Sequence, residues 1–183
     1  MDAAAELFYE AGFHGVSVDA IGQRAGLSGP AIYRTFSSKD EILATLLNET
    51  LDHLITSTAV VSDDPQADLE ELVLQQTRVV VKNRHLINIY QREVRSLVQP
   101  WKRQYQRRMG AYASRWEQAL KRRYPDAPEQ QVVMAVQAML GTIHSITYWP
   151  ANALDSPGLV DFVQRLVLSS LDVLDEVPAP AKS

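Results

Sequence analysis

The sequence predicts an all-α protein in which a three-helix helix-turn-helix domain precedes a larger helical domain. Apolar residues recur every three to four positions through long stretches, and alternating runs of β-branched residues are few. Glycine and proline are scarce within these stretches and fall mainly between them. The segment GQRAGLSGPAIYRTFSSK, residues 22–39, has the glycine spacing and the short apolar pattern of a helix-turn-helix.

Composition limits the possible functions. With 183 residues, of which 46% are apolar and 22% charged, the chain can bury a substantial core. It has no cysteine, which excludes disulfides, thiolate zinc sites and cysteine nucleophiles. The histidines are scattered and no glycine-rich phosphate loop is present, so we expect neither an enzyme nor a cofactor or metal site. No apolar run approaches the roughly 18 residues of a membrane span. We therefore expect a cytoplasmic protein without membrane contact.

The first three helices are predicted from their caps and their apolar spacing. Helices are expected at about residues 1–12, at about 18–25 after a cap at Ser17, and at about 29–35 after a cap at Ser28. Pro30 lies in the first turn of the third, where a missing N–H costs nothing. The first helix should bury a stripe of Ala4, Leu7, Phe8 and Ala11. A miniature core is expected from Val18, Ile21, Ala25, Leu27, Ile32 and Phe36.

Two glycines shape the motif. Gly22 lets two helices approach closely, and Gly26 supplies a turn with positive φ. The third helix is short and poor in leucine, so it is better suited to enter a groove than to form a core. We interpret it as a DNA-recognition helix.

The remaining helices complete two domains. The fourth begins at a capping box, Ser38 to Glu41, and runs to about residue 58. Others are predicted at about 66–82, 84–98, 100–123, 128–149 and 157–176, giving about nine in all. We assign residues 1–45 to the helix-turn-helix DNA-binding domain and 46–183 to a ligand-binding and dimerisation domain. SDDPQ, at 62–66, is the expected linker, and the tail VPAPAKS, at 177–183, is expected to fray.

The charge of the first 58 residues is unusual for a DNA-binding domain. Three basic side chains face eight acidic ones, a net charge of −5, whereas phosphate neutralisation supplies most non-specific affinity. Either the acids lie on faces turned away from DNA, or a basic N-terminal arm is missing. Because the sequence opens inside an amphipathic helix with no cap, we expect both effects to contribute.

The first quarter of the chain resembles the TetR family of bacterial helix-turn-helix transcriptional repressors. The resemblance rests on AAAELFYEAGFHGVSVDAIGQRAGLSGPAIYRTFSSKDEIL, residues 3–43. The patterns AxxLFxxxGFxxxSV, IxxxAGLS, IYRTF and SKDEIL occur together, in order and at the family's spacing. About nine helices in a chain of this length also agree with the family. The resemblance implies a cytoplasmic regulator that binds double-stranded operator DNA as a homodimer.

The resemblance assigns DNA-binding roles residue by residue. It implies phosphate contacts from Tyr33 and Lys39, and a cap with a backbone contact from Ser17. The face expected in the major groove, with Ser28 at its start, comprises Gly29, Pro30, Ala31, Arg34 and Thr35. This face carries no Asn, Gln or Lys, so we expect modest direct readout and more specificity from DNA shape. Tyr33 as a packing aromatic and Lys39 as a solvated neighbour of the capping box remain the alternatives.

The last two helices offer a dimer interface. Small residues at three-to-four spacing permit a close helix crossing: Ala135, Ala138, Gly141 and Ser145. The last helix carries a broad apolar face of Leu159, Phe162, Val163, Leu166, Val167, Ser170, Leu171 and Leu174, and we assign Phe162, Leu166 and Ser170 to the interface. The resemblance implies a four-helix bundle across the dyad. Ordinary internal core is the alternative.

Aromatic residues in the middle helices suggest an effector pocket. Tyr and Trp carry polar groups that need partners, which a mixed cavity would supply. The predicted lining is Tyr90, Glu93, Trp101, Tyr105, Met109, Tyr112, Trp116, His144 and Tyr148, with Trp149 beside them. An aromatic stripe is also common in protein cores, and a core histidine bonded to a carbonyl is the simpler interpretation of His144.

Residues 100–125 carry eight basic side chains against one acid, Glu117, a net charge of +7. This is either a solvated face or a site for an anionic ligand such as an acyl-CoA, whose phosphates would meet arginines. IYQREVRSL, at 89–97, is similar to short stretches of actinobacterial TetR regulators of lipid and steroid catabolism. The predicted function is a repressor released by a small, largely apolar effector. A helical ligand-binding or scaffold protein without DNA-binding activity is the alternative.

Overall fold

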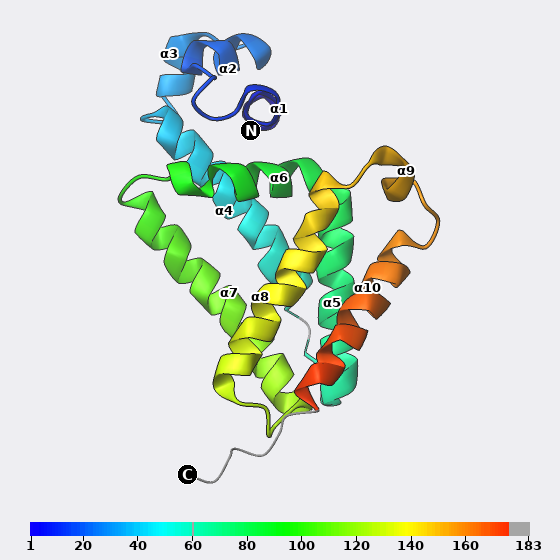
Figure 1. The fold of residues 1–183 in the computed structure, drawn as a ribbon. Helices are drawn as coiled ribbons and strands as arrows, with labels where there is room; N and C mark the ends of the chain where they lie inside the picture. The colour runs from blue at the N-terminus through cyan, green and yellow to red at the C-terminus, as the bar shows by residue number, and fades with distance from the viewer. Residues whose placement is uncertain (60, 176–183) are drawn as a thin grey trace. The chain divides into compact units, whose positions relative to one another are not determined.

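The computed structural model describes residues 1–59 and 61–175, and this part of the chain is helical without strands (Figure 1). Its ten α-helices are α1 (Asp2–Ala11), α2 (Val18–Arg24), α3 (Gly29–Tyr33), α4 (Lys39–Ser57), α5 (Pro65–Lys82), α6 (Arg84–Glu93), α7 (Trp101–Arg123), α8 (Glu129–Ser145), α9 (Ala151–Leu154) and α10 (Leu159–Ser169). Short 3₁₀ helices follow α6, α8 and α10 at Val94–Ser96, Ile146–Tyr148 and Ser170–Leu174. The predicted all-α class is confirmed.

The helices differ from the prediction in four places: one was missed, and three end earlier than expected. The prediction missed α9, because a single turn after Pro150 has too few residues to show a period. The helices expected to reach 98, 149 and 176 change to 3₁₀ geometry after Glu93, Ser145 and Ser169, as helix ends often do. The tail VPAPAKS lies outside the described residues. None of the described helices has both the length and the apolar character needed to cross a membrane.

The chain divides into two compact units. The first comprises Met1–His53 and Asn83–Met109, and the second comprises Leu54–Lys82 and the chain from Gly110 onward. Both α4 and α7 are continuous helices that contribute to each unit.

The first unit contains the helix-turn-helix. Helix α1 packs on α2 and on α6, and α2 packs on α3. A Cβ on Gly22 would lie 3.0 Å from the carbonyl oxygen of Leu27 in the turn and 3.5 Å from Ile32 Cγ1 of α3, which confirms the predicted close approach. Gly26 has φ of +69°, as the turn requires. Buried apolar side chains fill this unit: Phe8, Phe13, Val18, Ile21, Ile32, Leu43 and Leu47.

Three residues predicted to be buried in the first unit are exposed. Ala11, Ala25 and Leu27 face solvent, and Leu27 is 52% exposed. Leu27 lies in the turn between α2 and α3, and Ala11 and Ala25 end or follow their helices. The buried sets assigned from the helical period therefore extended too far toward the C-terminal ends of α1 and α2.

The second unit is a layered arrangement of helices in which α5 packs on α10 and on α8 (Figure 1). Its core is built from apolar side chains at helical spacing: Leu69, Leu72, Val73, Trp116, Leu120, Val136, Met139, Ile143, Val163 and Val167. Helix α10 buries the series Leu159, Val163 and Val167 and leaves Phe162 and Leu166 exposed. The single broad face predicted for this helix is thus two faces, one internal and one open.

Candidate DNA-binding surface and effector pocket

Helix α3 presents its predicted DNA-reading residues to solvent. Pro30, Tyr33, Arg34 and Thr35 are exposed, and Gly29 and Ala31 are half-buried. Ile32 is the buried residue of this helix and anchors it on α2 beside Gly22. The exposure of Tyr33, at 55%, removes the packing-aromatic interpretation for the chain as it stands without DNA. The exposed residues of α3 are therefore accessible to the major groove of a DNA duplex.

The two predicted serine caps behave differently. The Ser17 hydroxyl accepts the Ala20 N–H at 3.1 Å, which confirms the cap of α2. Ser28 occupies the N-cap position of α3 with extended backbone, but its side chain makes no capping hydrogen bond, so that prediction is wrong. A Cβ on Gly29 would lie 2.6 Å from Asp19 Oδ1. The Asp19 carboxylate thus lies against the first turn of α3, where a negative charge is favourable.

The capping box at the start of α4 is half formed. The Ser38 hydroxyl accepts the Glu41 N–H at 3.2 Å, as predicted. The Glu41 carboxylate instead accepts both the N–H and the hydroxyl of Ser37, each at 2.6 Å. These bonds lower the pKa of Glu41 below its usual value. The bond that a capping box makes from Glu41 to the N–H of Ser38 is thus made to Ser37 instead, so the backbone N–H groups of Ser37 and Glu41 both have side-chain acceptors.

Lys39 and Glu93 both form hydrogen bonds to the loop between α1 and α2. The Lys39 ammonium donates to the carbonyls of Phe13 at 2.8 Å and Val16 at 2.7 Å, and lies 4.4 Å from the Phe13 ring centroid. The Glu93 carboxylate, from the end of α6, accepts the Phe13 N–H at 3.1 Å. Arg92 donates to the carbonyl of Tyr9 at 3.2 Å. Glu93, predicted to line an effector pocket, is therefore engaged in the contact between α6 and the α1–α2 loop.

Replacing Lys39 with methionine tests the phosphate contact predicted for it. An ammonium has three N–H donors, and the loop carbonyls take two, so one is left for a phosphate. We expect the slope of log affinity for operator DNA against log salt to fall by about 0.9. Salt titrations of K39M give this slope, with K82M, at an exposed residue of α5, as the control. Weaker binding with an unchanged slope would limit Lys39 to holding the loop.

The residues predicted to form one effector pocket are divided between the two units. Tyr90, Glu93, Trp101, Tyr105 and Met109 belong to the first unit, and Tyr112, Trp116, His144 and Tyr148 belong to the second. In the first unit the rings of Tyr90 and Tyr105 lie 6.0 Å apart, and burial raises the pKa of both phenols. In the second unit Tyr148 is 60% exposed.

A buried polar chain crosses the second unit. The Tyr112 hydroxyl donates to Gln76 Oε1, and Gln76 Nε2 lies 3.0 Å from His144 Nε2. Burial lowers the pKa of His144 to about 4, so the ring is neutral at pH 7 and its Nε2 can accept from the Gln76 amide. All three side chains are buried. His144 is thus bonded to a side-chain amide, and the sequence did not single out Gln76.

His144 should make the protein less stable as the pH falls. Its pKa is near 6.5 in the unfolded chain and about 4 in the folded one, so the unfolded state binds the proton first. The contribution of neutral His144 to the free energy of unfolding is fully present above pH 6.5. It is lost progressively between pH 6.5 and 4, by up to about 3 kcal/mol. Urea unfolding at a series of pH values measures this, and H144Q should flatten the profile in this range. An unchanged slope in H144Q would contradict the assignment.

A small apolar pocket lies next to Tyr112. Its volume is about 210 Å³, and its lining is Ile55, Thr58, Ala59, Ala111, Tyr112 and Arg115. Trp116, one turn further along α7, is fully buried and packs edge to face on Tyr112, with ring centroids 6.4 Å apart. Its indole N–H has no hydrogen-bond partner among the described residues. Of the predicted pocket residues, Tyr112 lines this pocket and Trp116 belongs to the core behind it.

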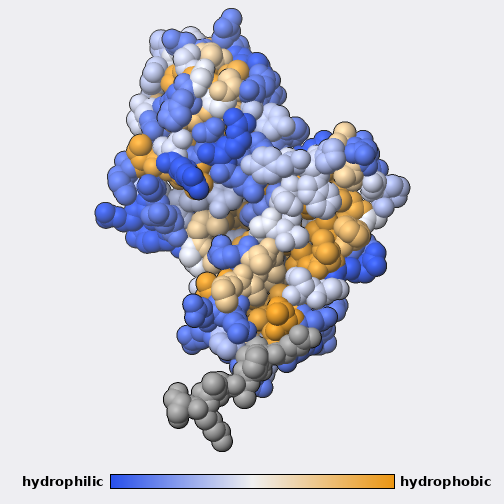
Figure 2. Space-filling view, viewed as in Figure 1, coloured by the Kyte–Doolittle hydropathy of each residue, from blue (hydrophilic) through white to orange (hydrophobic). Residues whose placement is uncertain are grey.

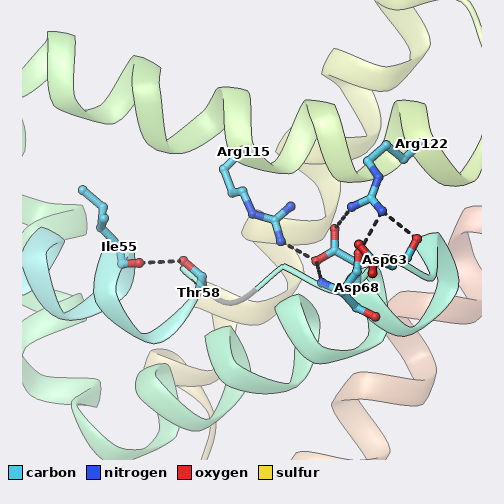
Figure 3. Close-up of polar contacts among 7 residues, drawn as sticks. Ile55, Thr58, Asp63, Asp68, Arg115 and Arg122 are labelled. Carbon is cyan, nitrogen blue, oxygen red and sulfur yellow. Dashed lines mark hydrogen bonds and ion pairs between the residues drawn. The ribbon is translucent and has the colours of Figure 1, made fainter.

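The basic residues of α7 are largely engaged within the protein. Arg108 pairs with Asp52 and Asn48, and Arg115 and Arg122 both pair with Asp68 (Figure 3). Arg123 bonds Gln66, and Lys121 donates to the carbonyls of Pro125 and Ala127. Lys102, Arg103 and Arg107 are exposed. The charged stretch is therefore neither a uniformly solvated face nor a single open anion site.

Helices α8 and α10 share an exposed apolar surface (Figure 2). Ala138, Gly141 and Ser170 are exposed, Ala135 and Ser145 are half-buried, and Phe162 and Leu166 are 53% and 46% exposed. The prediction missed Val133, Met134 and Val173, which are also exposed. Apolar side chains gathered in this way commonly mark a protein–protein contact. We call the residues named in this paragraph, which lie on α8, on α10 and on the following 3₁₀ turn, the α8–α10 surface.

Comparison with known proteins agrees with this architecture. The model described as bacterial regulatory proteins of the tetR family matches residues 1–46, and a tetracycline repressor-like C-terminal domain matches residues 62–152. The transcriptional activator FasR of Mycolicibacterium smegmatis is 41% identical over 54 residues, which cover 30% of this chain and 25% of FasR. The transcriptional repressor KstR2 of Rhodococcus jostii is 33% identical over 101 residues, 54% of this chain and 50% of KstR2. The matched stretches thus span half or less of these relatives.

Solved structures share the fold over nearly the whole chain. A tetR-family regulatory protein from Rhodococcus RHA1 has a TM-score of 0.82 at 18% identity, covering 94% of this chain and 93% of that one. AibR, solved with isovaleryl coenzyme A and operator DNA, has a TM-score of 0.77 at 15% identity, covering 92% and 93%. At these identities the solved structures show the shared fold, and the two domain models show the family. The chain belongs to the TetR family of transcriptional regulators.

Proposed function

We propose that this chain is a repressor that binds a near-palindromic operator as a homodimer and is released by a small, largely apolar effector. An acyl-CoA is the effector class we favour. The observation that carries the DNA-binding part is the solvent-exposed face of α3, held by Ile32 beside Gly22 in a family that regulates transcription. Repression rather than activation is part of the proposal, since the matched relatives include both kinds of regulator.

Dimerisation through the α8–α10 surface would place two copies of α3 on one duplex. A helix-turn-helix dimer reads two half-sites about one helical turn apart, which is why its operators are near-palindromic. Phe162 and Leu166 supply the apolar centre of such an interface, and the exposed Ala138 and Gly141 permit close helix approach.

Replacing Arg34 with alanine should lower specificity more than affinity. Arg34 is exposed at the end of α3 and is the basic side chain of the reading face, where a guanidinium can bond guanine O6 and N7. We expect a loss of about 1–3 kcal/mol on operator DNA and a smaller loss on random DNA. Paired titrations of R34A on the two duplexes give the difference. Equal losses on both would assign Arg34 to a phosphate instead.

The apolar pocket beside Tyr112 is the effector site that we propose. Its volume of about 210 Å³ exceeds a cavity known to hold benzene, so it suits an acyl group of about six to eight carbons. AibR, similar in fold, was solved with an acyl-CoA of short chain, which supports this class. Tyr112 connects the pocket to the buried Gln76–His144 pair, so a ligand could alter both.

Helix α4 provides a route from the pocket to the DNA-binding unit. Ile55, in the last turn of α4, and Thr58, just after the helix, line the pocket. Lys39, the first residue of α4, holds the loop between α1 and α2. An effector that favours one position of α4 would thereby bias the recognition helices. A preference of about 3 kcal/mol for the DNA-incompetent state, roughly 150-fold in affinity, is enough to shift operator occupancy.

Release from operator DNA by acyl-CoAs tests this proposal. Duplex DNA from upstream of the protein's own gene is bound in a gel-shift assay and challenged with isovaleryl-, octanoyl- and palmitoyl-coenzyme A. We expect release by the two shorter thioesters, because the pocket does not hold a long chain. Binding without release by any of them would leave a DNA-binding regulator and reject the acyl-CoA class. No binding to this or other upstream DNA would favour the scaffold alternative.

A further inference from the structure

A buried ionic cluster lies against the wall of the apolar pocket. Asp68, on α5, has a fully buried carboxylate that binds two guanidinium groups of α7 (Figure 3). Arg115 Nη2 lies 2.6 Å from Asp68 Oδ1, and Arg122 Nη1 lies 3.0 Å from Asp68 Oδ2. Arg115 also lines the pocket, where it is the charged residue among six lining residues.

The cluster holds one more positive charge than negative charge. One carboxylate faces two guanidinium groups, and the Arg115 side chain is 19% exposed. Attraction between charges is stronger in such a partly dry site than in water. A guanidinium binds carboxylate and phosphate oxygens in the same two-pronged geometry, so an incoming anion can take the place of Asp68 on Arg115.

The same cluster fixes the segment that joins α4 to α5. Asp68 Oδ1 accepts the Ser62 N–H at 3.2 Å, and Arg122 Nη2 donates to the carbonyls of Ser62 at 2.8 Å and Asp63 at 2.9 Å. Figure 3 shows Arg115 and Arg122 reaching from α7 to this segment and to Asp68 at the start of α5. The same Asp68 oxygen, Oδ1, accepts from Arg115 and from the Ser62 N–H, so a carboxylate that turns away from Arg115 would also turn away from Ser62.

We propose that Arg115 binds the anionic group of the effector and that this group displaces Asp68 from Arg115. The ligand class is an organic anion with a compact apolar body. The body occupies the pocket of about 210 Å³ against Ile55 and Tyr112, and the anionic oxygens meet Arg115. Asp68, left with Arg122, then loosens its hold on Ser62. This inference rests on the proposed function, because it takes this pocket as the effector site.

Calorimetric titrations of the full chain with octanoate, octanoyl-coenzyme A and coenzyme A test the contact. We expect R115Q to weaken binding of at least one probe by about tenfold or more, and R78Q, an exposed arginine of α5, to change it little. The probe that depends on Arg115 identifies the anion: a carboxylate if it is octanoate, a phosphate if it is coenzyme A or its thioester. Equal affinities in R115Q and the unchanged chain would overturn the proposal.

The Ser62 amide reports displacement of Asp68 without any substitution. In the unchanged protein saturated with a bound probe, we expect hydrogen exchange at the Ser62 N–H to accelerate by about tenfold or more, because it loses its carboxylate acceptor. A bound probe that leaves this exchange rate unchanged would contradict the displacement. Failure of all three probes to bind would also overturn the inference, whereas operator binding by the same preparation would leave the DNA-binding part of the proposed function intact.

Discussion

Replacing Asp68 with asparagine is expected to lower the free energy of unfolding by about 3 kcal/mol, near the lower end of the range for breaking a buried ion pair. The Asp68 carboxylate is fully buried, and it compensates the charges of Arg115 and Arg122. Asparagine keeps the size of the side chain and removes its charge, so two partly buried guanidinium groups lose their counter-ion. Urea unfolding followed by circular dichroism measures the loss.

A matched ion pair on the surface provides the control for D68N. Asp175 lies 3.8 Å from Arg123, and its side chain is 56% exposed. Because water screens such a pair, D175N should cost less than about 1 kcal/mol. A D68N protein as stable as D175N would mean that the buried cluster contributes nothing net, and would also weaken the case that Asp68 holds residues 62–63 in place.

Introducing glutamate at both Phe162 and Leu166 is expected to convert a dimer to a monomer. These side chains are 53% and 46% exposed in the chain taken alone, and in the proposed interface they would face the partner copy. Two carboxylates per chain would then be buried without counter-ions, which costs more than a dimer interface can supply. Sedimentation at micromolar concentration should show the unchanged chain as a dimer and the double variant as a monomer.

The same variant should lose operator affinity, because a monomer holds a single half-site. Linking two half-site contacts raises affinity by about 10²–10⁴, so we expect F162E/L166E to bind operator at least about 100-fold more weakly. V61E, at an apolar residue that is 60% exposed between α4 and α5, serves as the control and should remain dimeric. A double variant that remains a dimer would place the interface elsewhere on the protein.

The sequence predicted the parts of the molecule that depend on local pattern. Gly22 and Gly26 shape the helix-turn-helix as expected, and the Ser17 cap forms. In helix α10 the local pattern did not distinguish the buried face from the exposed one. A period of 3.6 places Phe162 near Val163 on one broad face, but it cannot say which part of that face another helix covers.

The parts that were missed depend on contacts between residues distant in sequence. Glu93 meets Phe13 across 80 residues, and Asp68 meets Arg115 across 47. No local signal identifies such partners, so the basic residues of α7 suggested a solvated face or an open anion site when most of them are engaged. The sequence signal that was overlooked is the position of Asp68 and Gln76 on the apolar face of α5. Polar side chains on such a face are buried and therefore require hydrogen-bond partners.

Stoichiometric binding to operator DNA tests the central claim most directly. A fluorescent duplex from upstream of the protein's own gene is titrated with the full chain at a duplex concentration well above the dissociation constant. The proposed function predicts saturation at two chains per duplex, and release when octanoyl-coenzyme A is added. Saturation at one chain per duplex, or equal binding to any DNA of the same length, would contradict a dimeric, operator-specific regulator.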